Sequence, residues 1–318
     1  MADQAGMSEK ADRRPSAREA RRPRNPHRAE TWQPTVLRRV RVRAVESLAP
    51  ELVRVTLEGD ELGEFATDAG DAVPAVRSPF FDDVVVFCLP DPVTGEVTLP
   101  VPTPGGGLGH PPGGAALVRE YTVRCLRGGA MCVDMVRHAS GAGMGWLESV
   151  RPGDEVTIVG PRVSRALPAV DRMLAVGDAT ALPALARLIE ERPPTMALDV
   201  LAAVPDPSAL PRTVLPALPR AVLPAVYPAD ADRVRVRVVA AAPGSAYEII
   251  DALAAAEFPT GFAWVAGESG MVTAVRRHLL ARGQEPDRVQ FTGYWRLGGP
   301  LCSPPAESAH ADLIRQPS

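Results

Sequence analysis

Apolar and polar residues alternate in short segments through the first half of the chain. The alternation is clearest in residues 36–45 and 52–57, and shorter candidate strands follow at 84–89, 96–99, 120–125, 131–136 and 155–159. A period of two is typical of strands with one buried face, and short strands separated by Gly- and Pro-rich turns indicate a barrel or a sandwich. The Gly- and Pro-rich residues 102–114 predict a long loop between two of these strands.

The pattern changes near Pro168, where apolar strands begin to alternate with amphipathic helices. Strands are expected at 172–177, 196–204, 234–240, 262–266 and 289–294, and helices at 181–191, 247–256 and 271–282. Strand–helix alternation predicts a parallel sheet with helices packed on its faces. The second half is therefore expected to be an α/β domain, with the boundary between about 160 and 170.

Composition indicates at which residues the two domains begin and end. Residues 1–34 lack apolar periodicity and contain four prolines, so they predict a disordered leader. Residues 1–43 hold twelve basic and five acidic side chains, a balance suited to polyanions, but a solvated leader is the favoured interpretation. The expected domains are 35–165 and 166–300, followed by a tail at 301–318.

Charge and hydropathy narrow the class of protein. The net charge of −3 gives no reason to expect nucleic-acid binding. No apolar run approaches the roughly 18 residues of a membrane span, and the polar N-terminal stretch does not look like a signal peptide. The expectation is a cytoplasmic protein with no membrane partner, as a monomer or weak dimer.

Four cysteines occur, at positions 88, 125, 132 and 302. None belongs to a C-x-x-C pair, and none lies at metal-ligand spacing from another Cys or His. This spacing predicts free thiols in a reducing compartment and no metal site.

The first motif with chemical content is the strand segment 119–124, which fits the R-x-Y-[ST] pattern of flavin-binding barrels. Residues i and i+2 of a strand share a face, so Arg119 could meet a pyrophosphate while Tyr121 lies along the isoalloxazine or ribityl chain. Thr122, followed by Val123, would offer a hydroxyl near the flavin N5 as the catalytic contact. An ordinary strand with alternating polar residues is the simpler alternative.

The second motif is a glycine-rich turn after a predicted strand. Gly143, Met144, Gly145 and Trp146 would let the backbone approach a pyrophosphate at the start of a short helix. His138 precedes the turn and is included as a candidate cofactor contact. An ordinary loop with a structural histidine explains the same residues.

The third motif consists of two strand-to-helix turns in the second half. Gly177, Asp178 and Thr180 form one turn, and Gly267 and Glu268 form the other. Ligands of open parallel sheets bind beyond the carboxyl ends of the strands, so both turns are expected at one nicotinamide site. There is no G-x-G-x-x-G fingerprint, and capped helices of a generic α/β domain remain the alternative.

Together these segments resemble the siderophore-interacting proteins, a family of FAD-dependent ferric-siderophore reductases, from about residue 35 to 296. The resemblance is carried by residues 119–124, 151–154, 160–161, 177–184, 264–268 and 293–296. It implies a ferredoxin-reductase-like architecture, bound FAD, NADPH or NADH as donor, and a ferric siderophore as acceptor. Tyr294 and Trp295 would cover the flavin or shape the nicotinamide pocket, or simply cap the last strand.

Three departures from the family pattern keep other functions open. Ala179 replaces a usual Glu, Met144 and Gly145 replace the Pro-Ala of the phosphate turn, and Arg162 and Val163 replace glycines. One alternative is a flavoenzyme of this family redirected to a biosynthetic acceptor. Another is a flavin- or chelate-binding module without enzymatic activity.

Overall fold

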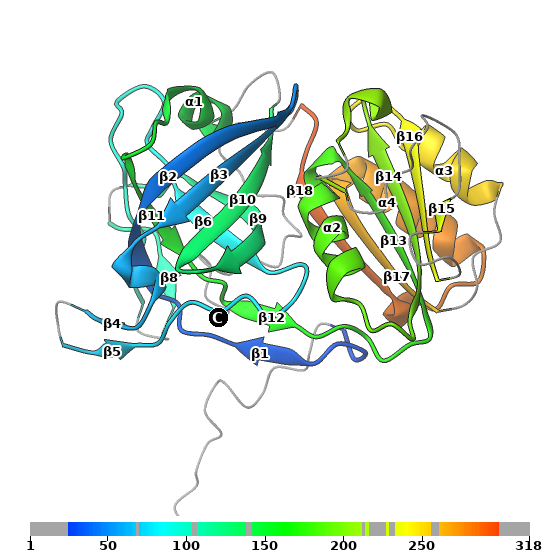
Figure 1. Cartoon of the computed structure of the whole chain (residues 1–318), viewed down its shortest axis with the longest axis horizontal. Helices are drawn as coiled ribbons and strands as arrows, with labels where there is room; N and C mark the ends of the chain where they lie inside the picture. Colours follow the sequence, from blue (N-terminus) through cyan, green and yellow to red (C-terminus); the bar gives the residue numbers. More distant parts are fainter. Residues whose placement is uncertain are drawn as a thin grey trace, which may run out of the picture.

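The computed structural model describes residues 25–67, 70–103, 107–112, 114–137, 142–211, 214–215, 227–228, 233–255 and 261–298. Figure 1 shows a barrel on one side and a helix-covered sheet on the other. Two short strands pair beneath the barrel: β1 (Glu30–Trp32), which precedes the barrel strands in the chain, and β12 (Val163–Arg165), which follows them. In the described part of the chain, no helix combines the length and apolarity that crossing a bilayer requires.

Six antiparallel strands close the barrel in the order β10-β3-β2-β11-β6-β9. Their bounds are β2 (Leu37–Ala49), β3 (Leu52–Glu58), β6 (Val84–Cys88), β9 (Val118–Arg127), β10 (Ala130–Val136) and β11 (Glu155–Val159). The buried residues of β3 match the predicted apolar and polar alternation. Val53, Val55 and Leu57 are completely buried, whereas the intervening Arg54 and Thr56 are only partly buried. The predicted antiparallel barrel is confirmed.

Two predictions about the connecting segments differ from the structure. The strand expected at 96–99 does not form: Val97 and Leu99 are 48% and 39% exposed, so their alternation has no buried face to fill. The loop expected at 102–114 contains the short hairpin of β7 (Val101–Pro102) and β8 (Leu108–Gly109). The remaining short elements of this half are β4 (Phe65–Ala66), β5 (Ala72–Val73), η1 (Asp60–Leu62) and helix α1 (Ala142–Ser149).

A sheet with the strand order β15-β16-β14-β13-β17-β18 forms the second half, and it is parallel except for β15 at its edge. The strands are β13 (Arg172–Asp178), β14 (Ala197–Val204), β15 (Tyr227–Pro228), β16 (Val234–Ala240), β17 (Phe262–Glu268) and β18 (Val289–Trp295). The helices are α2 (Leu182–Glu191), α3 (Tyr247–Ala254) and α4 (Ser269–Ala281), with short turns η2 (Ala179–Ala181), η3 (Pro207–Ala209) and η4 (Pro286–Arg288).

Alternate residues of each buried strand pack on opposite faces of this sheet. Met173 and Ala175 of β13 share a core with α2, whereas Leu174 and Val176 share one with α3 and α4. Both faces are therefore covered, which confirms the predicted α/β arrangement of the second half.

The two halves share part of their core. Phe81 lies in the loop before β6 of the barrel, yet it is completely buried in the core of the sheet half. Its ring packs edge-on against Trp264 of β17, with ring centroids 5.3 Å apart. An aromatic side chain contributes a large buried apolar area, so Phe81 fixes the barrel against the sheet.

The N-terminal prediction needs correction for residues 25–34, which were expected to be disordered. β1 pairs with β12, and Arg28 just before it is 1% exposed. Its guanidinium donates to the carbonyl oxygens of Ala166 (2.7 Å) and Arg165 (2.5 Å) in the link between the halves. Composition suggested a solvated segment, but tertiary hydrogen bonds order it. Residues 1–24 and 301–318 lie outside the described residues.

Candidate functional site

Strand β9 and helix α1 meet at the predicted FAD motif. A Cβ atom on Gly143 would lie 2.5 Å from the Tyr121 hydroxyl and 4.0 Å from Cγ of Arg119. The start of α1 therefore lies directly against these two side chains. A helix N-terminus, a guanidinium and an aromatic ring fit the pyrophosphate and ring system of a flavin dinucleotide. Burial raises the pKa of Tyr121 to about 12, so its phenol stays protonated.

The glycine-rich turn differs from its prediction in one respect. Gly143, Met144, Gly145 and Trp146 lie within α1, not before it. The side chains of Met144 and Trp146 are in the barrel core, where Trp146 packs edge-on against Phe87 at 5.5 Å. Their side chains therefore hold α1 on the barrel. His138 lies outside the described residues.

Thr122 lies where the barrel meets the sheet. Thr122 is 5% exposed, and its hydroxyl faces the phenol of Tyr294 from β18. Burial, with the negative charge of Asp82, raises the pKa of Tyr294 above its usual value. A threonine hydroxyl has one donor and two acceptor sites, so contact with one phenol leaves capacity for a ligand. Val123 points the other way, into the barrel core.

Asp178 connects the two predicted turns of the second half. It caps η2 by accepting from the backbone nitrogen of Thr180 at 2.8 Å and from its hydroxyl at 2.5 Å. Its other oxygen accepts from the backbone nitrogen of Glu268 and from Nε1 of Trp295, both at 2.8 Å. Burial raises its pKa despite these donors. The ends of β13, β17 and β18 thus meet at one carboxylate, as the sequence predicted for the two turns.

Close backbone approach at this junction requires glycine. Gly267 has φ +141°, and a Cβ there would lie 2.6 Å from the Asp178 carboxylate. A Cβ on Gly177 would lie 2.4 Å from the Ala181 side chain. The neighbouring Glu268 caps α4 through the backbone nitrogen of Met271 at 2.8 Å. Both acidic residues are thus engaged by the protein itself and hold the turns in place.

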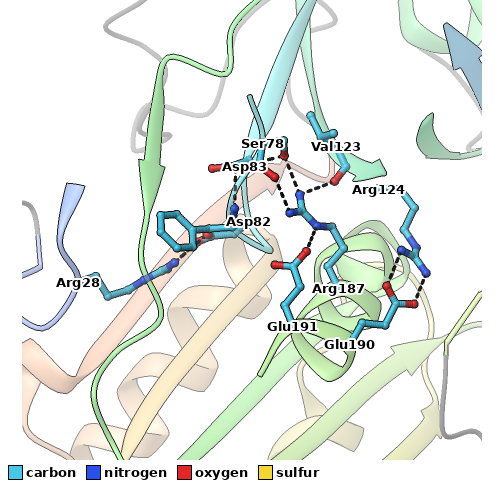
Figure 2. Close-up of polar contacts among 10 residues, drawn as sticks. Arg28, Ser78, Asp82, Asp83, Val123, Arg124, Arg187, Glu190 and Glu191 are labelled. Atoms are coloured by element: carbon cyan, nitrogen blue, oxygen red, sulfur yellow. Dashed lines mark hydrogen bonds and ion pairs between the residues drawn. The ribbon is translucent and has the colours of Figure 1, made fainter. Parts of the chain in front are cut away.

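A buried arginine on α2 spans the seam between the halves (Figure 2). Nη1 of Arg187 donates to the carbonyl oxygen of Val123 and to the Ser78 hydroxyl, both at 2.8 Å. Nη2 donates to the Ser78 carbonyl at 3.0 Å, and Nε pairs with Glu191 at 2.5 Å. Ser78 in turn donates to Asp83 at 3.1 Å. The sheet half is therefore hydrogen-bonded to the backbone of the flavin-motif strand.

Two adjacent carboxylates at the seam differ in their electrostatics (Figure 2). Burial opposes ionisation of Asp82, but the charge and hydrogen bonds of Arg28, at 2.6 and 2.8 Å, outweigh it and lower its pKa. Arg28 also donates to Gln290 of β18 at 2.9 Å. Asp83 accepts hydrogen bonds from the Phe80 backbone nitrogen at 2.9 Å and from the Ser78 hydroxyl at 3.1 Å, but burial outweighs them and raises its pKa to about 6.

Sequence reasoning missed the residues of this seam. Arg28 stood in a segment read as disordered, and Asp82 and Asp83 preceded a predicted strand without a motif. A signal existed for Arg187, because it interrupts the otherwise apolar face of its helix between Ala184 and Leu188. A buried arginine at such a position needs several acceptors, which predicts a neighbouring element.

Family comparisons agree with this geometry. The siderophore-interacting FAD-binding domain matches residues 41–165, and the siderophore-interacting protein model matches residues 170–298. A siderophore utilization protein from T. fusca is 31% identical, with 87% of this chain and 98% of that one covered and a TM-score of 0.69. The chain belongs to the siderophore-interacting protein family. Its first half is accordingly the FAD-binding domain of that family.

This member of the siderophore-interacting proteins is also similar to two other reductases. The NADPH-dependent ferric-chelate reductase of Escherichia coli K12 is 28% identical over 264 residues, which cover 81% of this chain and 92% of the relative. The ferredoxin reductase of carbazole 1,9a-dioxygenase is 17% identical over 82% of this chain and 70% of that one, with a TM-score of 0.54. The second likeness establishes the ferredoxin-reductase-like fold.

Proposed function

We propose that this protein transfers electrons from NADPH or NADH through FAD to a ferric siderophore and releases Fe(II). One nicotinamide supplies two electrons, so each turnover reduces two Fe(III) centres and releases one proton. The relative from E. coli is an NADPH-dependent ferric-chelate reductase, and this similarity supports the donor and acceptor classes. The observation that carries the proposal is the meeting of the flavin-motif strand with the sheet, where Thr122 faces Tyr294 and Arg187 donates to the carbonyl oxygen of Val123 at 2.8 Å.

The barrel residues are assigned to holding the cofactor. Arg119 and the first backbone N–H groups of α1 would bind the pyrophosphate, and the ring of Tyr121 would pack along the flavin. Thr122 would donate or accept at N5 while keeping Tyr294 in place. Bound FAD supplies the conversion of a two-electron donor into single-electron transfers, so no acid–base pair of the protein is needed.

The sheet residues are assigned to orienting the nicotinamide. The turns beginning at Gly177 and Gly267 lie at the carboxyl edge of the parallel strands, where such ligands bind. Asp178 and Glu268 would act as positioning residues, because their oxygens accept hydrogen bonds from the turns themselves. The Ala179 side chain is partly buried against the core, so the missing family Glu removes a charge without breaking any contact of Asp178.

An anaerobic titration tests the proposal. The purified protein, reconstituted with FAD, receives NADPH or NADH and then a ferric chelate, with a colorimetric trap for Fe(II). We expect bleaching of the flavin absorbance by a nucleotide and recovery with the chelate, with two Fe(II) trapped per nucleotide. A flavin that neither nucleotide bleaches contradicts the donor. Bleaching that the chelate fails to reverse contradicts the acceptor and favours a redirected reductase.

A further inference from the structure

Two cysteines face each other across neighbouring barrel strands. Cys125 of β9 and Cys132 of β10 are direct partners in the antiparallel register, and both are free thiols. The neighbours Met131 and Val133 fill the barrel core, so Cys132 lies on the outer face of its strand. Both cysteines are half-buried, which leaves them accessible from solvent.

Their separation suits a covalent link. Opposed residues of antiparallel strands have Cα atoms about 4.5 or 5.5 Å apart, and disulfides span Cα distances of about 4.4–6.8 Å. The thiols of Cys125 and Cys132 also shift each other's pKa, as side chains that lie close together do. In the described part of the chain no group of three or more His, Cys, Asp or Glu side chains could hold a metal ion. The pair is thus suited to thiol chemistry on its own.

The two thiols differ in their surroundings, and we assign their roles from this difference. The interaction between them lowers the pKa of Cys132 and raises that of Cys125, which favours Cys132 as the attacking thiol. The Thr56 hydroxyl lies 3.8 Å from Sγ of Cys132, which distinguishes this thiol, whereas the Arg54 guanidinium adds positive charge near both thiols. Arg54 is held in place by Asp134 at 2.7 and 2.8 Å.

Cys88 provides a contrast within the same barrel. It is 2% exposed, and burial raises its pKa to about 12. Since the thiolate is the reactive form of cysteine, Cys88 is expected to be inert under conditions in which Cys132 reacts.

We propose that Cys132 and Cys125 form a redox-active dithiol that reacts with hydroperoxides. The Cys132 thiolate attacks the peroxide oxygen, which forms Cys132 sulfenic acid and releases hydroxide. The Cys125 thiol then attacks the sulfenic sulfur, the S–S bond forms and water leaves. With hydrogen peroxide, two thiols and one peroxide give one disulfide and two waters.

The position of the pair gives the disulfide a structural consequence. The register between β9 and β10 shifts directly beside it, because Val133 faces Val123 and Arg124 is left without an opposite residue. Arg124 is bonded to Glu190 of α2 at 2.6 and 3.0 Å. The dithiol therefore adjoins the bulge at Arg124, whose side chain contacts the sheet half. Cys125 lies three residues after Thr122 on the same strand.

Peptide mapping of the full-length protein tests this inference without nucleotide, so its outcome does not depend on reductase activity. The protein is treated with hydrogen peroxide, alkylated and digested with trypsin, which cleaves after Arg124, Arg127 and Arg137. We expect peptides 125–127 and 128–137 to become joined with the loss of two hydrogens, while the peptide of Cys88 stays alkylatable. The joined peptides should separate again after treatment with a dithiol reductant.

Single variants separate the two roles. In Cys132→Ser, oxidation at Cys125 should slow at least about tenfold, because an ordinary thiol is only a few per cent thiolate at neutral pH. In Cys125→Ser, a dimedone-reactive sulfenic acid should accumulate at Cys132. Cys302→Ser should behave like the parent, and thermal unfolding of the reduced proteins checks that each variant is folded. Equal oxidation rates at Cys125 with and without Cys132, or stepwise addition of oxygen to Cys132 with no joined peptide in the parent, would overturn the inference.

Discussion

Nη1 of Arg187 lies 2.8 Å from the carbonyl oxygen of Val123, the residue that follows Thr122 in the flavin motif. One side chain of the sheet half is therefore hydrogen-bonded to β9, the strand that carries the predicted flavin motif. Hydride transfer depends steeply on such placement, because a shift of about 1 Å can cost about 100-fold in rate. Under the proposed function, the contacts of this seam would therefore affect the rate of hydride transfer.

Replacing Arg187 by Met should loosen this seam. The variant loses the bonds to Val123 and Ser78, and leaves buried acceptors unpaired, so we expect a loss of about 3 kcal/mol in the free energy of unfolding. Flavin reduction by nucleotide should slow even where the protein is fully folded. Urea unfolding and stopped-flow bleaching measure the two effects. The control Arg41→Ala breaks an exposed pair with Glu155 and should change stability by less than about 0.5 kcal/mol.

Asp83→Asn should stabilise the protein at neutral pH. The folded protein holds the Asp83 proton up to a pKa of about 6, while the unfolded chain releases it near 3.8. Stability of the parent therefore falls as the pH rises between these values, by up to roughly 3 kcal/mol in all. The amide oxygen can still accept hydrogen bonds from Phe80 and Ser78. The variant should therefore be more stable than the parent above pH 6 and equally stable below about pH 4. Denaturant midpoints across pH 4–8 test this, and a constant difference would contradict it.

The contribution of the neighbouring carboxylate, Asp82, to stability should depend on pH in the opposite direction. Asp82 has a lowered pKa in the folded state, so its contribution is present at neutral pH and is lost as the pH falls through that value. Asp82→Asn leaves the Arg28 guanidinium buried without a counter-ion, which costs about 3–5 kcal/mol at pH 7. The penalty should shrink in acid. Unfolding curves at pH 7 and below about pH 3 measure it, because the contribution is lost only below the unfolded pKa of 3.8. An equal penalty at both pH values would show that charge pairing is not the cause.

The sequence predicted the elements that depend on local pattern. Alternation, with one continuous apolar run at 84–89, located the six barrel strands. The strand–helix rhythm located β13, β14, β16, β17 and β18 with their helices. The turns at Asp178 and Glu268 were expected at one edge, because parallel strands bring their carboxyl ends together. These features follow from periodicity and capping, which a single sequence displays.

Features that depend on tertiary contact were not predictable in the same way. Arg28 is ordered by acceptors that lie 54 and more residues away in the chain, and nothing near it signals them. The glycines at 143 and 145 resembled a loop, since glycine lowers helix propensity, yet the buried side chains of Met144 and Trp146 hold the helix on the barrel. The pairing of Cys125 with Cys132 depends on strand register, which sequence spacing alone does not specify.

The two glycines of α1 offer a matched test of the flavin site. Gly143→Ala places a Cβ 2.5 Å from the Tyr121 hydroxyl, whereas Gly145→Ala meets nothing within 4 Å. Overpacking costs about 1–3 kcal/mol, so Gly143→Ala should weaken FAD binding roughly tenfold or more. Gly145→Ala should leave binding unchanged and stabilise the protein by roughly 0.5–1 kcal/mol. Flavin fluorescence titration and thermal unfolding compare them, and equal affinities would remove Tyr121 from the site.

Thr122→Val tests the assigned contact at the flavin N5. The variant keeps the shape of the side chain and removes the hydroxyl that meets Tyr294. Loss of one hydrogen bond in the transition state, about 1.4 kcal/mol, should slow nucleotide-driven bleaching about tenfold while FAD affinity stays within about twofold. Stopped-flow absorbance and fluorescence titration measure the two quantities.

Two companion variants show where that effect arises. Thr157→Val makes the same change on β11 of the barrel and should leave the bleaching rate unaltered. Tyr294→Phe removes only the partner of Thr122, so a rate equal to the parent's would place the effect of Thr122→Val at the flavin itself. If Tyr294→Phe is slowed as much as Thr122→Val, the pair acts together by holding the end of β18 against the barrel. A normal rate in Thr122→Val would contradict the assignment of its hydroxyl to hydride transfer.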